Sequence, residues 1–227
     1  MARLARIVFP GLPHHVTQRG NGRQQTFFDN ADYALYQALL GEHCAAAHVA
    51  VWAWCLMPNH IHAILVPTDE DGLRRALARV HRAYAGHVHQ RLRRTGHFWQ
   101  GRFGCVPMDA AHCGAALRYV ALNPVRAGLV ARAQDWRWSS VRAQLGIEHD
   151  LLTDVAAVRD FAPDFAAMLA GAEDEEATRR LRRAESVGRP VGSDAFLDAL
   201  ERRYGRSVKP RRRGRPRKAG EISALSP

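Results

Sequence analysis

The segment from residue 49 to residue 66 limits the possible folds most strongly, because two apolar runs in it are separated by only a short turn. The first run, 49–56, is rich in aromatic and β-branched residues, which favours a β-strand. Pro58 and Asn59 are typical turn residues, and the apolar sequence resumes directly after them. The segment therefore predicts a tight antiparallel hairpin.

Two histidines begin the second run of this hairpin, with Ile61 between them. Side chains alternate between the two faces of a strand, so His60 and His62 share one face and lie about 7 Å apart. Two imidazoles held in this way can bind a single divalent ion. The alternative is a pair of polar side chains on a solvated sheet face. The His-apolar-His pattern directly after a turn favours the metal site.

The rest of the first half of the chain places the hairpin in an α+β domain. Apolar periodicity predicts four further elements: a strand at 14–18, a helix at about 30–48 capped by Asp29 or Asn30, a helix beginning at Thr68 or Asp69, and a strand at 98–106. The resulting order is that of the ferredoxin-like split βαβ fold, an antiparallel sheet with both helices on one face. The opposite face is then free to hold a site.

A third helix is expected from about Ala110 to Asn123, with Asp109 as its cap and Pro124 as its stop. Tyr119 and Asn123 lie one turn apart on this helix. If the helix packs across the open sheet face, Asn123 supplies an oxygen as a third metal ligand and Tyr119 lies beside the ion. A phenol beside a Lewis acid is a workable nucleophile toward a phosphodiester. The alternatives are a buried core aromatic for Tyr119 and a helix-end cap for Asn123.

The chain is strongly basic, with a net charge of +11 and a pI of about 10.5, and 47% of its residues are hydrophobic. A packed core and a polyanionic partner are therefore expected, and nucleic acid is the leading candidate. A membrane surface is less favoured because no basic amphipathic insertion helix is evident, and neither a transmembrane run nor a signal peptide is recognisable. We expect a cytoplasmic protein with reduced thiols, because no two of its cysteines form a Cys-x-x-Cys pair: Cys44, Cys55, Cys105 and Cys113.

Three segments, 60–62, 98–103 and 119–129, resemble the REP-associated tyrosine transposases, which belong to the single-tyrosine branch of the HUH nucleases. The resemblance extends from about His14 to Leu145. It implies the ferredoxin-like fold and cleavage of one DNA strand, which leaves a 5′-phosphotyrosine link and a free 3′-hydroxyl. It also implies a divalent metal, Mg²⁺ or Mn²⁺, and single-stranded or hairpin DNA as the partner of a monomer or homodimer.

The resemblance assigns roles position by position. Tyr119 matches the nucleophile, and His60 and His62 match the metal ligands. Asn123 stands where related insertion-sequence transposases have glutamine, and asparagine is the expected residue in this subfamily. One of the two histidines of the first strand, His14 or His15, is also expected to face the site.

The DNA-binding surface is predicted from arginines near the proposed site: Arg19, Arg23, Arg102, Arg118 and Arg126. The arginines of the second helix are either a further contact surface or an ordinary exposed face. Phe98 or Trp99 either stacks an unpaired base or packs in the core. Near the C-terminus, Arg213-Gly214-Arg215-Pro216 resembles the core of an AT-hook, and a basic tail that binds phosphates without specificity is the alternative.

These predictions divide the chain into a transposase-like domain at 1–146, a helical linker region at 147–187 and a basic DNA-binding tail at 188–227. The segment from Asp150 to about Arg183 is expected to be helical and to carry no chemistry. Two other functions compete with the nuclease. A DNA- or RNA-binding regulator would keep the fold without cleaving, and a zinc-dependent hydrolase would need a carboxylate near the histidines. The nearest acids in sequence, residues 69–71, lie beyond the strand and count against the hydrolase.

Overall fold

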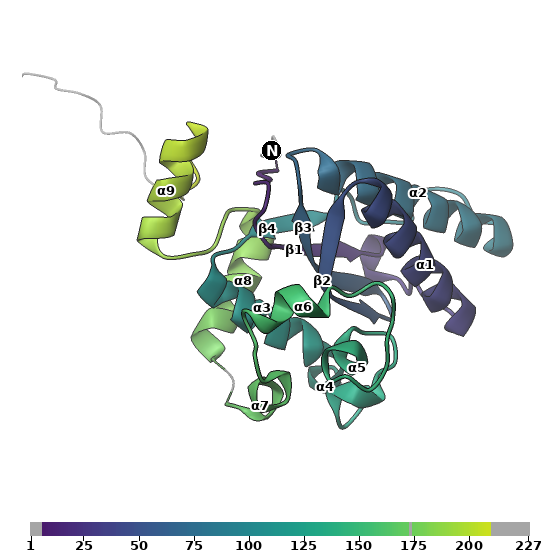
Figure 1. Cartoon of the computed structure of the whole chain (residues 1–227). Coiled ribbons are helices and arrows are strands. Elements are labelled where there is room, and N and C mark those ends of the chain that lie inside the picture. The colour runs from purple at the N-terminus through teal and green to yellow at the C-terminus, as the bar shows by residue number, and fades with distance from the viewer. Residues whose placement is uncertain (1–5, 173, 210–227) are drawn as a thin grey trace, which may run out of the picture.

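The computed structural model describes residues 6–172 and 174–209. Within these ranges the chain forms a four-stranded antiparallel sheet with the order β2-β3-β1-β4 (Figure 1). The strands are β1 (His14–Arg19), β2 (Val49–Met57), β3 (His60–Pro67) and β4 (Gly104–Pro107). This order is that of the split βαβ arrangement, and the predicted α+β, ferredoxin-like fold is confirmed.

The hairpin forms as expected from its sequence. β2 and β3 pair directly around Pro58 and Asn59, with Met57 opposite His60. The backbone at Pro58 is also tied to the segment before α1, because its carbonyl accepts hydrogen bonds from the N–H groups of Thr26 and Phe27 at 2.8 and 3.2 Å. The turn that places the histidines is therefore held from outside the hairpin as well as from within it.

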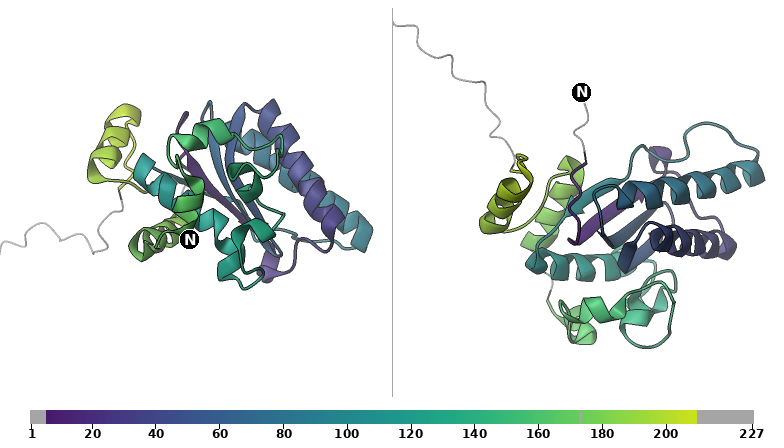
Figure 2. Two further views of the ribbon diagram at one scale, coloured as in Figure 1. Left: turned by 60° about the horizontal axis from the view of Figure 1, so that its bottom comes forward. Right: turned by 45° about the horizontal axis from the view of Figure 1, so that its top comes forward.

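Two long helices, α1 (Asn30–Ala46) and α2 (Gly72–Leu92), cover one face of the sheet (Figure 2). Asp29 caps α1 as predicted, since its side chain accepts a hydrogen bond from the Asp32 N–H at 2.9 Å. The second helix begins later than the predicted Thr68 or Asp69. The Asp69 carboxylate instead accepts from the Asp71 N–H at 2.9 Å, which forms a turn before the helix starts.

The opposite face carries α3 (Ala110–Ala121), which packs on β2 and β3 (Figure 2). Asp109 caps it, as predicted, by accepting from the His112 N–H at 2.9 Å. The helix ends two residues before the predicted Asn123, which instead begins the short helix α4 (Asn123–Arg126). Pro124 lies in the first turn of α4, where a missing N–H is tolerated, so it starts a helix in addition to ending one.

The predicted strand at 98–106 is wrong in its first part, because β4 begins only at Gly104. Phe98 and Trp99 turn toward the core beneath α2, where the Trp99 indole N–H donates to the His81 carbonyl at 3.0 Å. Residues 98–100 still meet the end of β1, because Trp99 forms an isolated bridge with Gly20 and the Gln100 N–H donates to the Arg19 carbonyl at 2.9 Å. The pairing is interrupted between this point and Gly104. The ladder between β1 and β4 therefore covers only residues 14–17 of β1.

The segment predicted as one helical stretch from Asp150 to about Arg183 is divided into α6 (Val155–Arg159), α7 (Phe165–Ala170) and α8 (Glu175–Val187). Asp154, Asp164 and Asp174 each accept a hydrogen bond from the N–H three residues later, so each starts a new helix. The last of these, α8, returns to pack against α3 and β4. This packing brings α8 to the face of the sheet that carries the histidines.

The remaining described elements are short: η1 (Asn21–Arg23), η2 (Ala133–Asp135), α5 (Val141–Gln144) and α9 (Asp194–Tyr204). The last helix, α9, packs its Leu197 and Leu200 against Ile7 and Phe9 at the start of the described chain. Among the described helices, none has the length and apolar character needed to cross a bilayer.

Candidate active site

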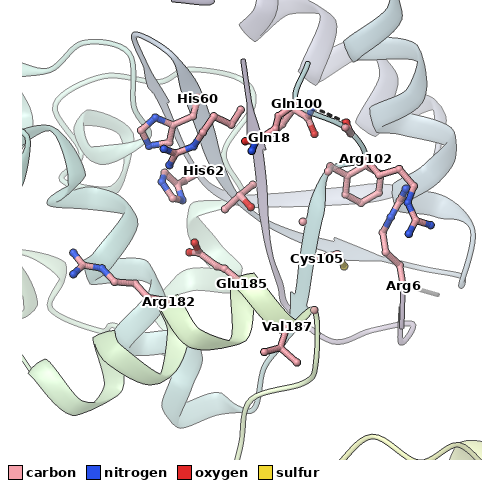
Figure 3. Close-up of a pocket in the computed structure, with 16 residues that line it drawn as sticks. Arg6, Gln18, His60, His62, Gln100, Arg102, Cys105, Arg182, Glu185 and Val187 are labelled. Atoms are coloured by element: carbon pink, nitrogen blue, oxygen red, sulfur yellow. Dashed lines mark hydrogen bonds between the residues drawn. The ribbon is translucent and has the colours of Figure 1, made fainter. Parts of the chain in front are cut away.

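The register of the sheet gathers polar side chains on the face that α3 crosses. Residues directly opposite each other in an antiparallel pair share a face. Arg19 lies opposite His60 and Thr17 opposite His62, so β1 and β3 present these four side chains to the same side. His15 lies two residues before Thr17 and joins them. Figure 3 shows His60 and His62 on the sheet opposite Glu185 and Arg182 of α8.

Tyr119 lies against this cluster from the helix side. Its ring centroid is 5.5 Å from that of His62 and 5.9 Å from that of His15, in edge-on contacts. The centroids of His60 and His62 are 4.9 Å apart. The tyrosine is 7% exposed. The structure therefore brings together the phenol and the two histidines that were predicted separately from the sequence.

Two guanidinium groups flank the Tyr119 ring. The Arg126 Cζ lies 4.8 Å from the ring centroid, and the same side chain donates a hydrogen bond to the Tyr119 carbonyl at 3.0 Å. The Arg182 Cζ, from α8, lies 5.5 Å from the ring. Both guanidinium groups lie at cation–π distance from the ring.

Asn123, the predicted third ligand, lies just beyond the end of α3 as the first residue of α4. Its Nδ2 is buried without a hydrogen-bond partner among the described residues. An unsatisfied buried amide is unfavourable, and rotation of the amide by half a turn would put its oxygen at the same place. Asn123 was expected to be the last residue of α3 and is instead the first residue of α4, and its role as a third metal ligand stays a prediction.

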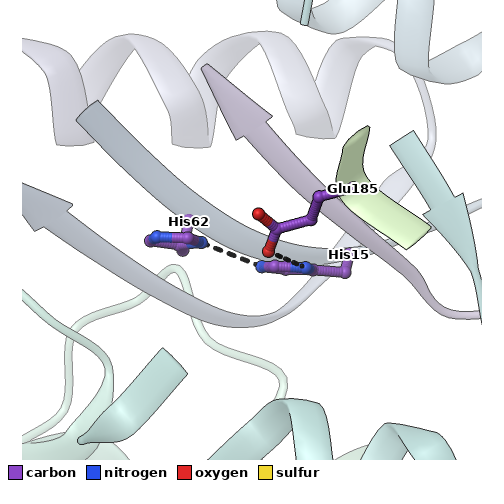
Figure 4. Close-up of side chains that lie close together, drawn as sticks. All are labelled: His15, His62 and Glu185. Carbon is purple, nitrogen blue, oxygen red and sulfur yellow. Dashed lines mark hydrogen bonds and ion pairs between the residues drawn. The ribbon is translucent and has the colours of Figure 1, made fainter. Parts of the chain in front are cut away.

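Glu185 was not predicted from the sequence; it belongs to α8 and enters the site from the C-terminal region (Figure 4). Its Oε1 lies 3.2 Å from His15 Nδ1, which is ion-pair distance, although the two groups are not aligned as a hydrogen bond. His15 Nε2 and His62 Nδ1 are hydrogen-bonded at 2.9 Å. Donor atoms of these three residues all lie within 4.8 Å of one another, so they too can hold a metal ion.

The buried imidazoles are neutral at physiological pH, as metal binding requires. Burial lowers the pKa of His15 to about 3 and, with the nearby Arg19 charge, that of His60 to about 4. The pKa of His62 is lowered well below its usual value by burial and by its charged neighbours. Burial has the opposite effect on Glu185 and raises its pKa to about 7, which Arg19 and Arg182 partly offset. The donor set therefore fits a divalent cation: imidazole nitrogens together with amide or carboxylate oxygens.

A groove of about 730 Å³ opens beside the histidines (Figure 3). Four arginines line it: Arg6, Arg19, Arg102 and Arg182. Two of these, Arg19 and Arg102, were predicted as phosphate contacts. Arg6 and Arg182 were missed, because they come from the start of the chain and from α8.

The other predicted arginines lie in different surroundings. Arg118 donates from Nε to the Met168 carbonyl at 2.8 Å and also contacts carbonyls of Leu169 and Gly171, so it caps the end of α7. Arg23 is exposed on η1. Arg213 and Arg215 lie outside the described residues.

The second helix pairs several of its arginines with its own and neighbouring acids. Arg74 pairs with Asp71, and Arg75 with Asp69. Arg91 pairs with the buried Asp32 of α1 at 2.6 Å. Of the two readings for this helix, these ion pairs favour an ordinary exposed face. The groove beside the histidines is the better candidate for a phosphate-binding surface.

Comparisons with known proteins agree with this geometry. A family model described as "Transposase IS200 like" matches residues 9–123, which extend from before β1 to the start of α4. The chain belongs to the IS200-like transposase family. It is also similar to a solved structure of a REP-associated tyrosine transposase bound to a REP hairpin, with 20% sequence identity and a TM-score of 0.56. That match covers 68% of this chain and 93% of the other. No curated protein matches the chain.

The resemblance drawn from the three sequence motifs is therefore confirmed at the level of the family, and the structural likeness confirms the fold. A member of this family is a transposase that acts on DNA. The family match includes His15, His60, His62 and Tyr119, but Glu185 lies beyond it. A zinc-dependent hydrolase was disfavoured because no carboxylate was expected near the histidines. Glu185 supplies such a carboxylate, from outside the matched region.

Proposed function

We propose that the chain is a metal-dependent single-strand DNA endonuclease and transferase that uses Tyr119 as its nucleophile. The observation that carries the proposal is the contact of the Tyr119 ring with His62, at the edge of an arginine-lined groove. The substrate is single-stranded DNA that carries a hairpin or palindromic repeat. The solved relative is bound to such a hairpin, and the groove here supplies the positive charge that a phosphate backbone requires.

His60 and His62 would hold the cation, with an oxygen from Asn123. A bound divalent cation polarises a phosphoryl oxygen and offsets the charge that develops on it. Tyr119 supplies its hydroxyl oxygen, which forms a bond to phosphorus as the bond from phosphorus to the 3′ oxygen breaks. The phenolic proton passes to solvent, and the departing 3′ oxygen takes up a proton. Arg126 and Arg182 stabilise the negative charge that develops on the phenol oxygen before attack.

The deciding experiment incubates the full chain with labelled single-stranded hairpin DNA and Mn²⁺ or Mg²⁺, and then looks for a covalent adduct that survives denaturant. We expect Tyr119→Phe to abolish the adduct and to leave DNA binding nearly unchanged. Tyr204→Phe, on α9, is the matched control and should form the adduct normally. Salt-sensitive DNA binding by the wild type without any adduct would instead favour a non-cleaving regulator.

The tyrosine and the histidines come from one chain, so we propose that each molecule carries a complete site. A mixture of Tyr119→Phe and His62→Ala should therefore remain inactive. Recovery of cleavage in the mixture would show that a dimer exchanges its third helix between subunits.

Metal binding can be measured without DNA. Mn²⁺ at about 100 times its dissociation constant should stabilise the wild-type fold by about 2.7 kcal/mol. The double variant His60→Ala/His62→Ala should show no such increase in its thermal midpoint. An equal increase of the thermal midpoint in the double variant would show that Mn²⁺ binds at another site.

A further inference from the structure

Each of the two proposed metal ligands has a polar partner at one of its ring nitrogens. A neutral imidazole has one N–H and one lone pair, and only the nitrogen with the lone pair can bind a metal. Proteins fix the choice by engaging the other nitrogen in a hydrogen bond. The partners of His60 and His62 therefore decide which nitrogen of each is available.

The partner of His60 is Asn59. The Asn59 Nδ2 donates to the Arg23 carbonyl at 3.1 Å, so its Oδ1 is the atom that faces His60. That oxygen can only accept, and His60 Nδ1 lies 2.6 Å from it. His60 therefore carries its proton on Nδ1 and leaves the Nε2 lone pair free.

The partner of His62 is a second histidine. His62 Nδ1 and His15 Nε2 are 2.9 Å apart, with the two rings only 5° from parallel (Figure 4). Two neutral imidazoles can form this hydrogen bond in either direction. The direction is set at the far side of His15, where the Glu185 Oε1 lies 3.2 Å from Nδ1.

In its ionised form Glu185 can only accept, so its charge favours the proton on the facing His15 Nδ1, although the two groups are not aligned as a hydrogen bond. His15 Nε2 then carries the lone pair, and His62 must donate from Nδ1. We propose that Glu185 and His15 are positioning residues that hold His62 in the tautomer with a free Nε2. This inference rests on the proposed function only for the role of that Nε2 as a metal ligand.

The burial of this chain of contacts supports the assignment. His15 is 0% exposed, so water does not compete for its ring nitrogens. Glu185 is held in place by α8, whose Leu181 and Ala184 are buried against the α3 side of the sheet. Because α8 follows the matched region 9–123, a C-terminal helix completes a site whose other parts lie in the family domain.

The competing arrangement uses the same residues differently. His15, His62 and Glu185 would all ligate one ion directly, since their donor atoms lie within 4.8 Å of one another. In that case the hydrogen bond between the two histidines would be replaced by two bonds to the metal. His15 contributes one coordinating nitrogen in the competing arrangement and none in the proposed one.

The first test is the tautomer of His62 in the metal-free, full-length protein, read from the ¹⁵N chemical shifts of its imidazole at pH 7.5. We expect the proton on Nδ1 in the wild type. His15→Phe, which keeps a buried ring without an acceptor, should give a mixture of tautomers. Glu185→Gln should shift His62 in the same direction but less. In both variants His60 should keep its proton on Nδ1, which also shows that the fold is intact.

Asn59→Ala is the matched control, because it should disturb the tautomer of His60 and leave that of His62 unchanged. A His62 proton on Nε2 in the wild type, or an unchanged His62 tautomer in His15→Phe, would overturn the proposal. These readings need neither metal nor DNA. Their failure is therefore distinguishable from a failure of the proposed nuclease activity.

The second test is the affinity and coordination of Mn²⁺. Loss of a positioning partner should weaken Mn²⁺ binding by roughly 10–100-fold in His15→Phe. The electron spin echo modulation of bound Mn²⁺ should show the same number of coordinating imidazole nitrogens in the wild type and in this variant. Loss of one nitrogen signal in His15→Phe would show direct ligation and contradict the positioning role.

Discussion

The two faces of the sheet are built from alternate residues of the same strands, yet they differ in what covers them. On one face Val16, Ile61 and Leu65 pack beneath α1 and α2 in a continuous apolar core that includes Leu77 and other fully buried side chains. On the other face α3 and α8 cover only part of the sheet. A groove of about 730 Å³ remains beside the histidines there.

The difference shows how one fold separates stability from chemistry. The α1–α2 face holds long helices whose apolar surfaces are complementary to the sheet. The groove face places neutral histidines, arginines and a carboxylate close together, which is unfavourable for folding unless each group finds a partner. Substitutions on the first face should therefore change the free energy of unfolding, and substitutions on the second should change binding and catalysis.

The largest expected contrast is between Leu77→Ala and Tyr119→Phe. Leu77 is 0% exposed in the α1–α2 core, so its truncation should reduce the free energy of unfolding by about 2–5 kcal/mol. Tyr119→Phe keeps the ring and removes one hydroxyl, so its effect should stay within about 1 kcal/mol. Urea denaturation of both variants measures the contrast. Equal losses would show that Tyr119 is primarily a core residue.

The next largest effect is the loss of folding stability in acid. It involves buried histidines on both faces of the sheet. Burial lowers the pKa of His14 to about 4 and that of His81 to about 3 on the α1–α2 face, and the site histidines are lowered as well. As the pH falls, these histidines take up protons in the unfolded chain before they do so in the folded one. Their contribution to the free energy of unfolding is therefore fully present above about pH 6.5 and is lost as the pH falls toward 4.

Glu185 acts in the opposite direction, because its raised pKa favours the folded state at lower pH, but it is outnumbered by the histidines. The urea midpoint should therefore fall between pH 6.5 and pH 4, the window set by the usual and the lowered pKa of His14. His81→Phe should flatten part of this decline, with the exposed His87→Gln as its control. A midpoint that rises across this range would contradict the assignment of neutral, buried histidines.

The smallest expected effect concerns the arginines. Arg19→Gln and Arg102→Gln, in the groove, should each reduce the slope of log affinity against log salt by roughly 0.7–0.9 for DNA binding. Arg79→Gln, on the exposed side of α2, should leave the slope unchanged. A larger change of slope in Arg79→Gln than in the groove variants would indicate that DNA binds on the α1–α2 side of the molecule.

Local sequence patterns were sufficient for the parts of the fold that depend on neighbouring residues. The turn at Pro58 and the alternation that follows it placed His60 and His62 on one face, and Asp109 marked the start of α3. The spacing of Tyr119 on that helix then predicted a residue facing the sheet. The structure places its ring beside His62.

The parts that could not be predicted depend on contacts between distant segments. Phe98 and Trp99 look like strand residues, but Trp99 forms only an isolated bridge with Gly20 and both side chains pack with the core beneath α2. Glu185 lies in a charged, amphipathic helix one turn after the buried Leu181, and only the packing of α8 against α3 and β4 brings it to His15. The helix contains Glu175, Glu176 and Glu185, and no local motif marks Glu185 as a site residue.

The proposed mechanism depends most on the identity of the attacking group. The covalent adduct with labelled hairpin DNA can be trapped, digested with trypsin and mapped by mass spectrometry. Cleavage after Arg118 and Arg126 would release a peptide that begins with Tyr119, and we predict that the nucleotide is attached to that peptide. Attachment to any other peptide, such as the one that contains Tyr84, would contradict the account.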